Sequence, residues 1–130
     1  MALPNGAGGY QVGDGNLSEV ILGTQQAPVA KAAAATLTAA ELANGIITYS
    51  GAAANLQVTS GADLDAAFTS MKVNSCFDFF IINTSANTAT VTVNTGCTIV
   101  GAAAVATATS CNFRVRKSGD ATYVFNRIAG

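Results

Sequence analysis

The sequence predicts a mainly β fold: an antiparallel β-sandwich or barrel-like domain with one or two short helices and an extended N-terminal arm. Three observations support this prediction. From residue 75 onward, apolar residues alternate with polar ones, which is the period of a half-buried strand. Before that point, two helix-capping patterns each precede a short helical run. The first 18 residues are rich in glycine and show neither period. We therefore divide the chain into an arm, residues 1–18, and one β-rich domain, residues 19–130.

The arm combines five glycines and one proline with four large apolar side chains, Leu3, Tyr10, Val12 and Leu17. Glycine loses more backbone entropy on ordering than any other residue, so these side chains gain little by packing within the segment. They gain more by lying along a neighbouring surface. We therefore expect a docking arm whose partner-binding residues are these four.

The domain begins with short extended segments. Residues 19–22 are a strand candidate, and strands are expected again at residues 46–49 and 55–59 because of their alternation and flanking turns. The alanine-rich run 27–36 favours a helix by propensity. It begins with Pro28 and lacks an amphipathic stripe, however, so an extended segment is at least as good an interpretation.

A first short helix is expected over residues 39–44. Thr38 and Glu41 have the spacing of a capping box, in which the hydroxyl accepts from the N3 amide and the glutamate accepts from the cap amide. Gly45 then supplies the left-handed residue that ends many helices.

A second helix is expected from about residue 61 to residue 71, with Ser60 and Asp63 repeating the capping logic. Its apolar residues recur at positions i, i+3, i+4 and i+7, and they are Leu64, Ala67, Phe68 and Met71. This stripe favours a face turned to the core over a groove for a partner.

Five strands are expected in the second half of the chain, at residues 76–83, 88–94, 97–100, 104–116 and 122–128. In the second of these, threonines alternate with alanine and valine, which is typical of a half-exposed antiparallel strand. The last two form a hairpin in which Cys111, Phe113 and Val115 face inward.

The run 77–82 is apolar on both faces except at Asp78, so it should be a central strand. A carboxylate in such a strand is costly unless it is paired. We therefore expect an arginine of the final hairpin to be its partner.

Composition narrows the classes of partner. Half of the residues are hydrophobic and only 10% are charged, where soluble domains average about a quarter. A surface with so little charge is poorly protected against association. The net charge of −1 argues against nucleic acid as the main ligand. No apolar run is long enough for a membrane span, and no secretory signal pattern is visible.

The three cysteines, Cys76, Cys97 and Cys111, each lie in an apolar or β-like run. We interpret them as reduced, packed thiols, with disulfide bonding or metal binding as lesser alternatives.

The sequence shows no credible catalytic constellation, so we expect a protein that is not an enzyme and needs no cofactor or metal. It contains no histidine, which removes the usual general base near neutral pH. Asp63 and Asp65 point to different sides of a helix, so we interpret them as a solvated N-terminus and not as a carboxylate pair. The glycine-rich runs near residues 6–9 and 14–16 lack the spacing of a phosphate-binding or calcium-binding loop.

Four of the six cationic residues cluster on the final hairpin, and they are Arg114, Arg116, Lys117 and Arg127. A solvated strand face explains them most simply. A functional alternative is a partner-binding surface that forms salt bridges with acidic groups of a neighbouring subunit, since interfaces favour arginine. Binding of nucleic acid is the weakest of the three interpretations.

Three stretches together resemble a known family: LPNGAGGYQVGDGN at residues 3–16, KVNSCFDFFIIN at residues 72–83 and FRVRKSG at residues 113–119. They resemble small head decoration, or cement, proteins of aquatic tailed bacteriophages. The resemblance implies a β-rich virion protein, made in the host cytoplasm, that sits on the outer capsid surface at three-fold positions. It also implies a homotrimer whose partner is the major capsid protein, and a terminal arm that clamps neighbouring capsomers.

We therefore expect a non-enzymatic capsid decoration subunit that binds the expanded phage head and stabilises neighbouring capsomers, without binding nucleic acid or membrane. One alternative is a tail-associated or fibre subunit of the virion that contacts the host surface. Another is a soluble β-sandwich binding module, which would need a concave pocket with convergent polar groups.

Overall fold

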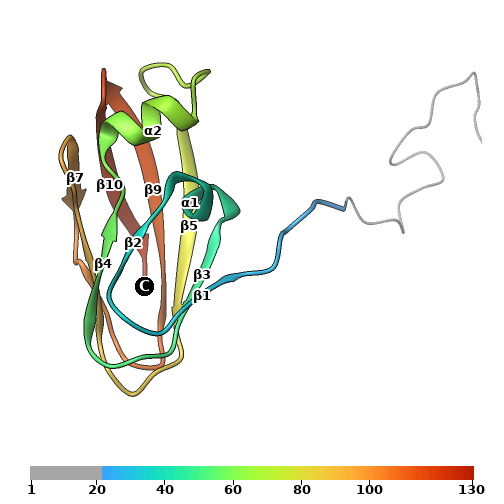
Figure 1. Ribbon diagram of the computed structural model, residues 1–130, viewed down its shortest axis with the longest axis vertical. Helices are drawn as coiled ribbons and strands as arrows, with labels where there is room; N and C mark the ends of the chain where they lie inside the picture. Colours follow the sequence, from blue (N-terminus) through green and yellow to red (C-terminus); the bar gives the residue numbers. More distant parts are fainter. Residues whose placement is uncertain (1–21) are drawn as a thin grey trace, which may run out of the picture.

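The computed structural model describes residues 22–130, which contain ten strands and two helices (Figure 1). The six-stranded sheet has the order β1 (Val29–Lys31), β3 (Ile46–Tyr49), β5 (Cys76–Asn83), β9 (Ser110–Gly119), β10 (Thr122–Ala129) and β7 (Cys97–Val100). The four-stranded sheet has the order β2 (Ala35–Leu37), β4 (Ala54–Val58), β6 (Ala89–Thr92) and β8 (Ala104–Val105). This arrangement confirms the prediction of a mainly β, sandwich-like or barrel-like fold with two short helices.

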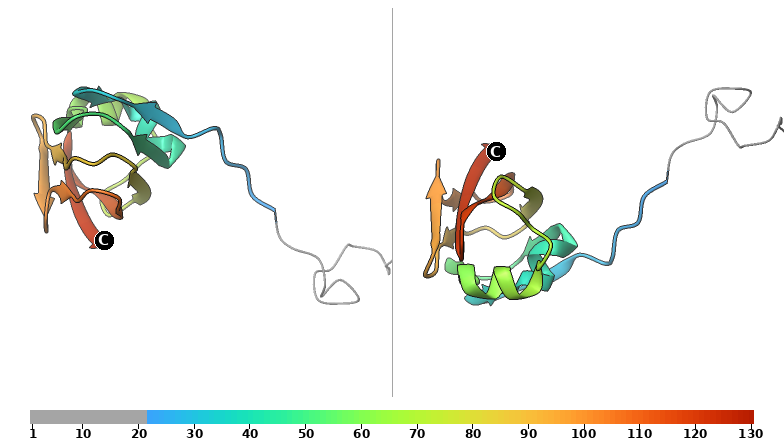
Figure 2. Two further views of the ribbon diagram at one scale, coloured as in Figure 1. Left: turned by 90° about the horizontal axis from the view of Figure 1, so that it is seen from below. Right: turned by 90° about the horizontal axis from the view of Figure 1, so that it is seen from above.

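The chain alternates between the two sheets from β1 to β9, so that each successive strand enters the opposite sheet. Strands that return to the same sheet therefore run parallel: β1, β3 and β5 in one sheet, and β2, β4 and β6 in the other. The views along the long axis show the two sheets enclosing a common interior (Figure 2).

The expectation of mainly antiparallel pairing was wrong. Five of the eight strand pairs are parallel, and only β5–β9, β9–β10 and β6–β8 are antiparallel. Alternation of apolar and polar residues shows that one face of a strand is buried, but it carries no information about the direction of the neighbouring strand. Here the facing sheet supplies the crossover that parallel strands require.

The core lies between the sheets and is dominated by five fully buried aromatic side chains, Tyr49, Phe79, Phe113, Tyr123 and Phe125. The rings of the three phenylalanines cluster, with centroids 5.4 Å apart for the stacked pair Phe79–Phe113 and 6.1 Å apart for the edge-on pair Phe79–Phe125. Burying each such side chain contributes roughly 1.5–3 kcal/mol. The inward face predicted for the final hairpin is confirmed, because Cys111, Phe113 and Val115 are buried.

Helix α1 (Ala39–Asn44) begins and ends as predicted. The Glu41 amide donates to Thr38 Oγ1 at 3.2 Å, the Thr38 amide donates to Glu41 Oε1 at 3.0 Å, and Gly45 has φ +95°. Both helices lie at the same end of the sheets (Figure 1).

Helix α2 (Gly61–Ala67) begins at the predicted cap, where the Asp63 amide donates to Ser60 Oγ at 3.2 Å. It ends four residues before the expected boundary at residue 71, because Phe68 leaves the helical conformation. Phe68 and Met71 still pack against the core, but they do so from the turn that follows the helix. The apolar spacing therefore predicted correctly which side chains pack against the core, but it overestimated the length of the helix.

Other strand boundaries differ in detail. The expected strand 104–116 is broken by a turn in which Ala108 has φ +55°, so that β8 and β9 belong to different sheets. The run 27–36 is not helical; it contains β1 and the first two residues of β2. The strand candidate 19–22 lies outside the described residues except for Leu22, which is not in a strand.

The cysteines are free thiols. Cys97 and Cys111 are buried, and desolvation raises the pKa of both. The expectation of packing was wrong for Cys76, which is exposed because strand alternation places it on the outer face of β5.

Candidate functional site

The basic residues of the hairpin do not form one patch. Arg114 and Arg116 lie on the outer face of β9. Arg114 makes the expected contact with Asp78 of the central strand β5: its Nε and Nη2 donate to the two carboxylate oxygens at 2.7 and 2.9 Å. This bidentate hydrogen bond lowers the pKa of Asp78 and raises that of Arg114. Arg116 donates to Asn74 Oδ1 at 3.0 Å and has no carboxylate partner in the described region.

The other two basic residues point toward the interior side of the hairpin, at opposite ends. Lys117 Nζ lies 3.0 Å from Asp65 Oδ1, near the β9–β10 turn. Arg127, far from that turn, donates to the carbonyl oxygens of Ala102 at 3.0 Å and Gly130 at 3.1 Å, and also to that of Ala104. Both side chains therefore hold parts of the fold together, and the outer face of the sheet keeps only Arg114 and Arg116.

Asp65 joins helix α2 to the final hairpin. Its carboxylate accepts hydrogen bonds from Tyr123 Oη at 2.6 Å and from the Ala121 amide at 2.7 Å, beside the ion pair with Lys117. The hydrogen bond from Tyr123, with the others, lowers the pKa of Asp65 to about 2. The interpretation of Asp65 as a solvated helix terminus was wrong, because a contact spanning more than 50 residues leaves no mark in the local sequence.

The outer face of the six-stranded sheet exposes large apolar side chains. Phe80 and Ile82, on the central strand β5, are 43% and 38% exposed. Val100 on β7 and Ile128 on β10 are 56% and 57% exposed. The charged side chains on this face are the neutralised pair Asp78–Arg114, and Arg116. We call this surface, with its centre at Phe80 and Ile82, the apolar face.

Asn112 lies at the centre of the apolar face, between Phe80 on one side and Ala129 on the other. Its Oδ1 atom is buried and has no hydrogen-bond partner among the described residues. An unsatisfied buried acceptor costs about 1–3 kcal/mol. The isolated domain therefore keeps an unfavourable polar group in the middle of this surface.

The opposite outer surface has a different chemistry. The four-stranded sheet carries a shallow depression lined by small or uncharged polar side chains, namely Ala34, Ala35, Thr36, Asn55, Gln57 and Thr92. The molecule thus has one apolar outer face and one polar, uncharged outer face.

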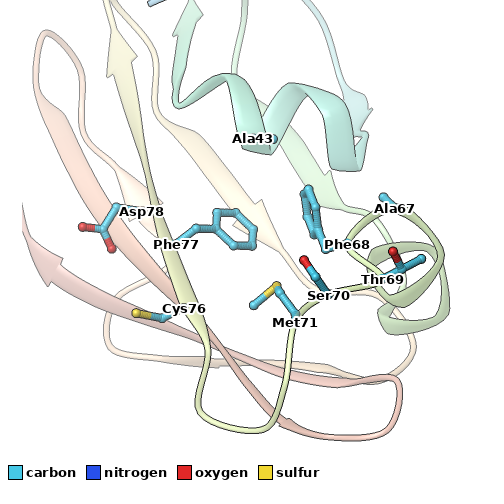
Figure 3. A pocket seen from close by; sticks show the side chains of 9 residues that line it. All are labelled: Ala43, Ala67, Phe68, Thr69, Ser70, Met71, Cys76, Phe77 and Asp78. Carbon is cyan, nitrogen blue, oxygen red and sulfur yellow. The ribbon is translucent and has the colours of Figure 1, made fainter. Parts of the chain in front are cut away.

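A cavity of about 350 Å³ opens between the two helices and the start of β5 (Figure 3). The side chains of Phe68, Met71 and Phe77 point toward one another in it, while Cys76 and Asp78 point to the other side of β5. The rings of Phe68 and Phe77 meet edge to face, with centroids 5.2 Å apart. All three apolar side chains are only partly buried, so the cavity has apolar walls that nothing in the described structure covers.

Neither the cavity nor the apolar face gathers groups for catalysis or for metal binding. Residues 22–130 contain no cluster of three cysteine or acidic side chains arranged to hold a metal ion. Their two helices, of six and seven residues, are too short and too polar to cross a membrane. The four predicted arm residues, Leu3, Tyr10, Val12 and Leu17, lie outside the described residues.

The apolar face had a signal in the sequence. The run 77–82 is apolar on both faces, which predicted a central strand, and β5 is central. A strand that is apolar on both faces is usually covered on both of them. The core covers one of them, and the other remains open. The cavity had no comparable signal, because it depends on helix α2 ending early.

Comparison of the chain with protein-family models, with curated proteins and with solved structures found no match.

Proposed function

We propose that this chain is a non-enzymatic virion structural protein, a capsid decoration or cement subunit that binds the outer surface of the expanded phage head and stabilises neighbouring capsomers. The resemblance of residues 3–16, 72–83 and 113–119 to head decoration proteins supplies the class. The observation that carries the proposal is the apolar face, because a stretch of exposed apolar side chains with little charge is typical of a protein-binding surface.

The apolar face suits a stable contact better than a transient one. Phe80 and Ile82 are its apolar residues on β5, Asn112 lies opposite Phe80 on β9, and the pair Asp78–Arg114 and the cation Arg116 lie further along these two strands. Apolar side chains with a few polar groups among and around them are the arrangement of a protein interface. Arg116 is the cation left for an acidic group of the capsid, since Arg114 is already neutralised.

Assembly as a homotrimer would strengthen the attachment. A ligand that binds the expanded lattice and not the unexpanded one stabilises the expanded state by linkage. Three linked copies raise the effective concentration of each contact at its neighbouring site. In this proposal, the arm residues Leu3, Tyr10, Val12 and Leu17 order on the capsid as additional contacts. The major capsid protein is the partner, and the virion surface is the location.

The test combines light scattering with sedimentation. The purified chain is first sized by chromatography with light scattering, and then mixed with expanded phage heads that lack the protein and sedimented. A trimer that co-sediments at saturable stoichiometry is the expected result. A monomer that stays in the supernatant would contradict the proposal.

Arg116→Glu is the cleaner charge-reversal variant for this assay. The corresponding change at Arg114 would also place two carboxylates opposite each other at Asp78, and would therefore disturb the sheet itself. We expect Arg116→Glu to weaken attachment while the melting temperature of the domain stays the same.

The cavity beside α2 favours a second candidate function, a soluble β-sandwich binding module. A volume of about 350 Å³ is within the range of small-molecule sites, and its walls are apolar. A ligand screen by thermal shift, with purified chain and no heads, separates the two functions. A tail-associated or fibre subunit is instead tested by binding to host cells, and no specific feature of residues 22–130 favours it.

A further inference from the structure

The cavity between the helices and β5 has an apolar interior and a polar rim. Phe68, Met71 and Phe77 form the interior, and Thr69 and Ser70 lie at the edge (Figure 3). The cavity beside this edge-on pair of phenylalanine rings, about 350 Å³ in volume, has room for a third aromatic ring in the same kind of contact. A side chain that combines an aromatic ring with a hydroxyl group matches both parts of this site.

The start of the described chain is tied down close to this cavity. Gln25 Nε2 donates to the Asn44 carbonyl oxygen at 2.7 Å, and Asn44 Nδ2 donates to the Ala27 carbonyl oxygen at 3.0 Å. Asn44 is the last residue of α1, and its neighbour Ala43 lines the cavity. The N-terminal segment is therefore attached to the residue that follows Ala43 of the cavity wall.

The geometry points to an intramolecular ligand. We propose that the cavity binds the chain's own N-terminal arm, residues 1–18, with Tyr10 as the side chain that enters it. Fifteen residue steps separate Tyr10 from Gln25, and an extended chain spans about 3.3 Å per residue, so the reach of roughly 50 Å far exceeds the distance required.

The chain can also make the necessary turn. The segment from Leu22 to Pro28 is exposed and leads away from the sheets (Figures 1 and 2). Gly23 has no atom within 4 Å of the position that a Cβ would occupy, so the backbone is free to reverse there.

The arm should bind the cavity of its own subunit in preference to that of a second copy, because its local concentration there is higher. A short tether gives an effective local concentration in the millimolar range. A copy outside the trimer, at micromolar concentration, competes poorly with it. Tyr10 is also the one arm residue with both a ring for the phenylalanine walls and a hydroxyl for the rim.

Binding of the arm in the cavity would regulate attachment to the capsid, and this regulatory role rests on the proposed function. In the protein free of the capsid, the cavity would hold the arm and keep its apolar side chains from causing aggregation beyond the trimer. On the capsid, the arm would exchange the cavity for the lattice. A ligand-gated release of this kind requires only that the arm binds the capsid more tightly than it binds the cavity.

The test uses the full chain without phage heads, so its failure would leave the decoration role untouched. The chain has two methionines, Met1 and Met71, and Met71 lines the cavity. Labelling methionine methyl groups with carbon-13 therefore gives a direct NMR signal from the site. We expect Tyr10→Ser to move the Met71 signal, because the ring current of the tyrosine is lost, while the matched variant Leu3→Ser leaves it in place. An unchanged Met71 signal in Tyr10→Ser would overturn the proposal.

A second measurement approaches the site from the cavity side. Tyr49 and Tyr123 are fully buried, so quenching of tyrosine fluorescence by acrylamide reports mainly on Tyr10. We expect Ala67→Leu, which fills the cavity from its wall, to increase quenching. Equal quenching in the two proteins would contradict binding in the cavity. A Met71 signal that changes on dilution would show an arm donated by a second copy, and would overturn the intramolecular form.

Discussion

Replacing Phe80 and Ile82 with serine should weaken attachment to phage heads while the domain remains folded. The two side chains are 43% and 38% exposed, so this is the fraction that a partner can still cover. Complete burial of a phenylalanine or isoleucine side chain is worth about 1.5–3 kcal/mol. Scaled by exposure, the pair contributes about 1.2–2.4 kcal/mol at each subunit contact.

That free energy corresponds to a loss of about 8- to 60-fold in affinity for each contact, and the loss multiplies if three subunits bind together. The assay is co-sedimentation of the Phe80→Ser/Ile82→Ser protein with heads over a range of concentrations. The matched control is Val73→Ser, which removes a 56% exposed apolar side chain that lies before β5 and off the apolar face.

Circular dichroism on the free proteins separates loss of contact from loss of structure. If the double variant is folded and binds heads with wild-type affinity, the apolar face is not the attachment surface. If the control loses as much affinity as the double variant, general exposure of apolar side chains is responsible, and the reasoning from this face fails.

Two further predictions concern the junction between α2 and the final hairpin. Tyr123 and its other partners lower the pKa of Asp65 to about 2, below the ordinary value near 4, so its contribution to stability is present above pH 4 and is lost as the pH falls toward 2. Asp65→Asn should therefore lower the melting temperature at pH 7 and flatten the dependence of the melting temperature on pH between 4 and 2. A variant with the pH profile of the wild type would contradict this assignment. Gly61→Ala should destabilise the fold by about 1–3 kcal/mol in urea unfolding, since its Cβ would lie 1.9 Å from the Ala121 carbonyl oxygen, whereas Gly23→Ala, with open space around it, should leave the unfolding midpoint unchanged.

Local signals in the sequence predicted local structure well. The capping box at Thr38 and Glu41, the cap at Ser60 and the inward face of the final hairpin all depend on residues a few positions apart, and the structure confirms them. The pairing of Asp78 was also predictable, because a carboxylate in an apolar strand requires a partner and the chain offers few cations.

Contacts between distant segments could not be read in the same way. The parallel pairing of β1, β3 and β5 depends on how the chain returns through the opposite sheet. The alternation of apolar and polar residues along a strand does not indicate that path. The inward turn of Lys117 toward Asp65 depends on where α2 meets the hairpin. For this reason, four basic residues close in sequence were expected to share one surface, and the fold distributes them over three environments.

The alternation of strands between sheets also governs how the fold can form. The register joins residue 29 to residue 47, residue 47 to residue 81, and residue 97 to residue 123, so most strand pairs close long loops. Proteins dominated by such contacts have high contact order and fold in milliseconds to seconds, far more slowly than helical bundles. The β9–β10 hairpin is the local exception, and β5 pairs directly with it. We expect these three strands to form the folding nucleus, and until they assemble, the earlier strands leave their edges open to other chains.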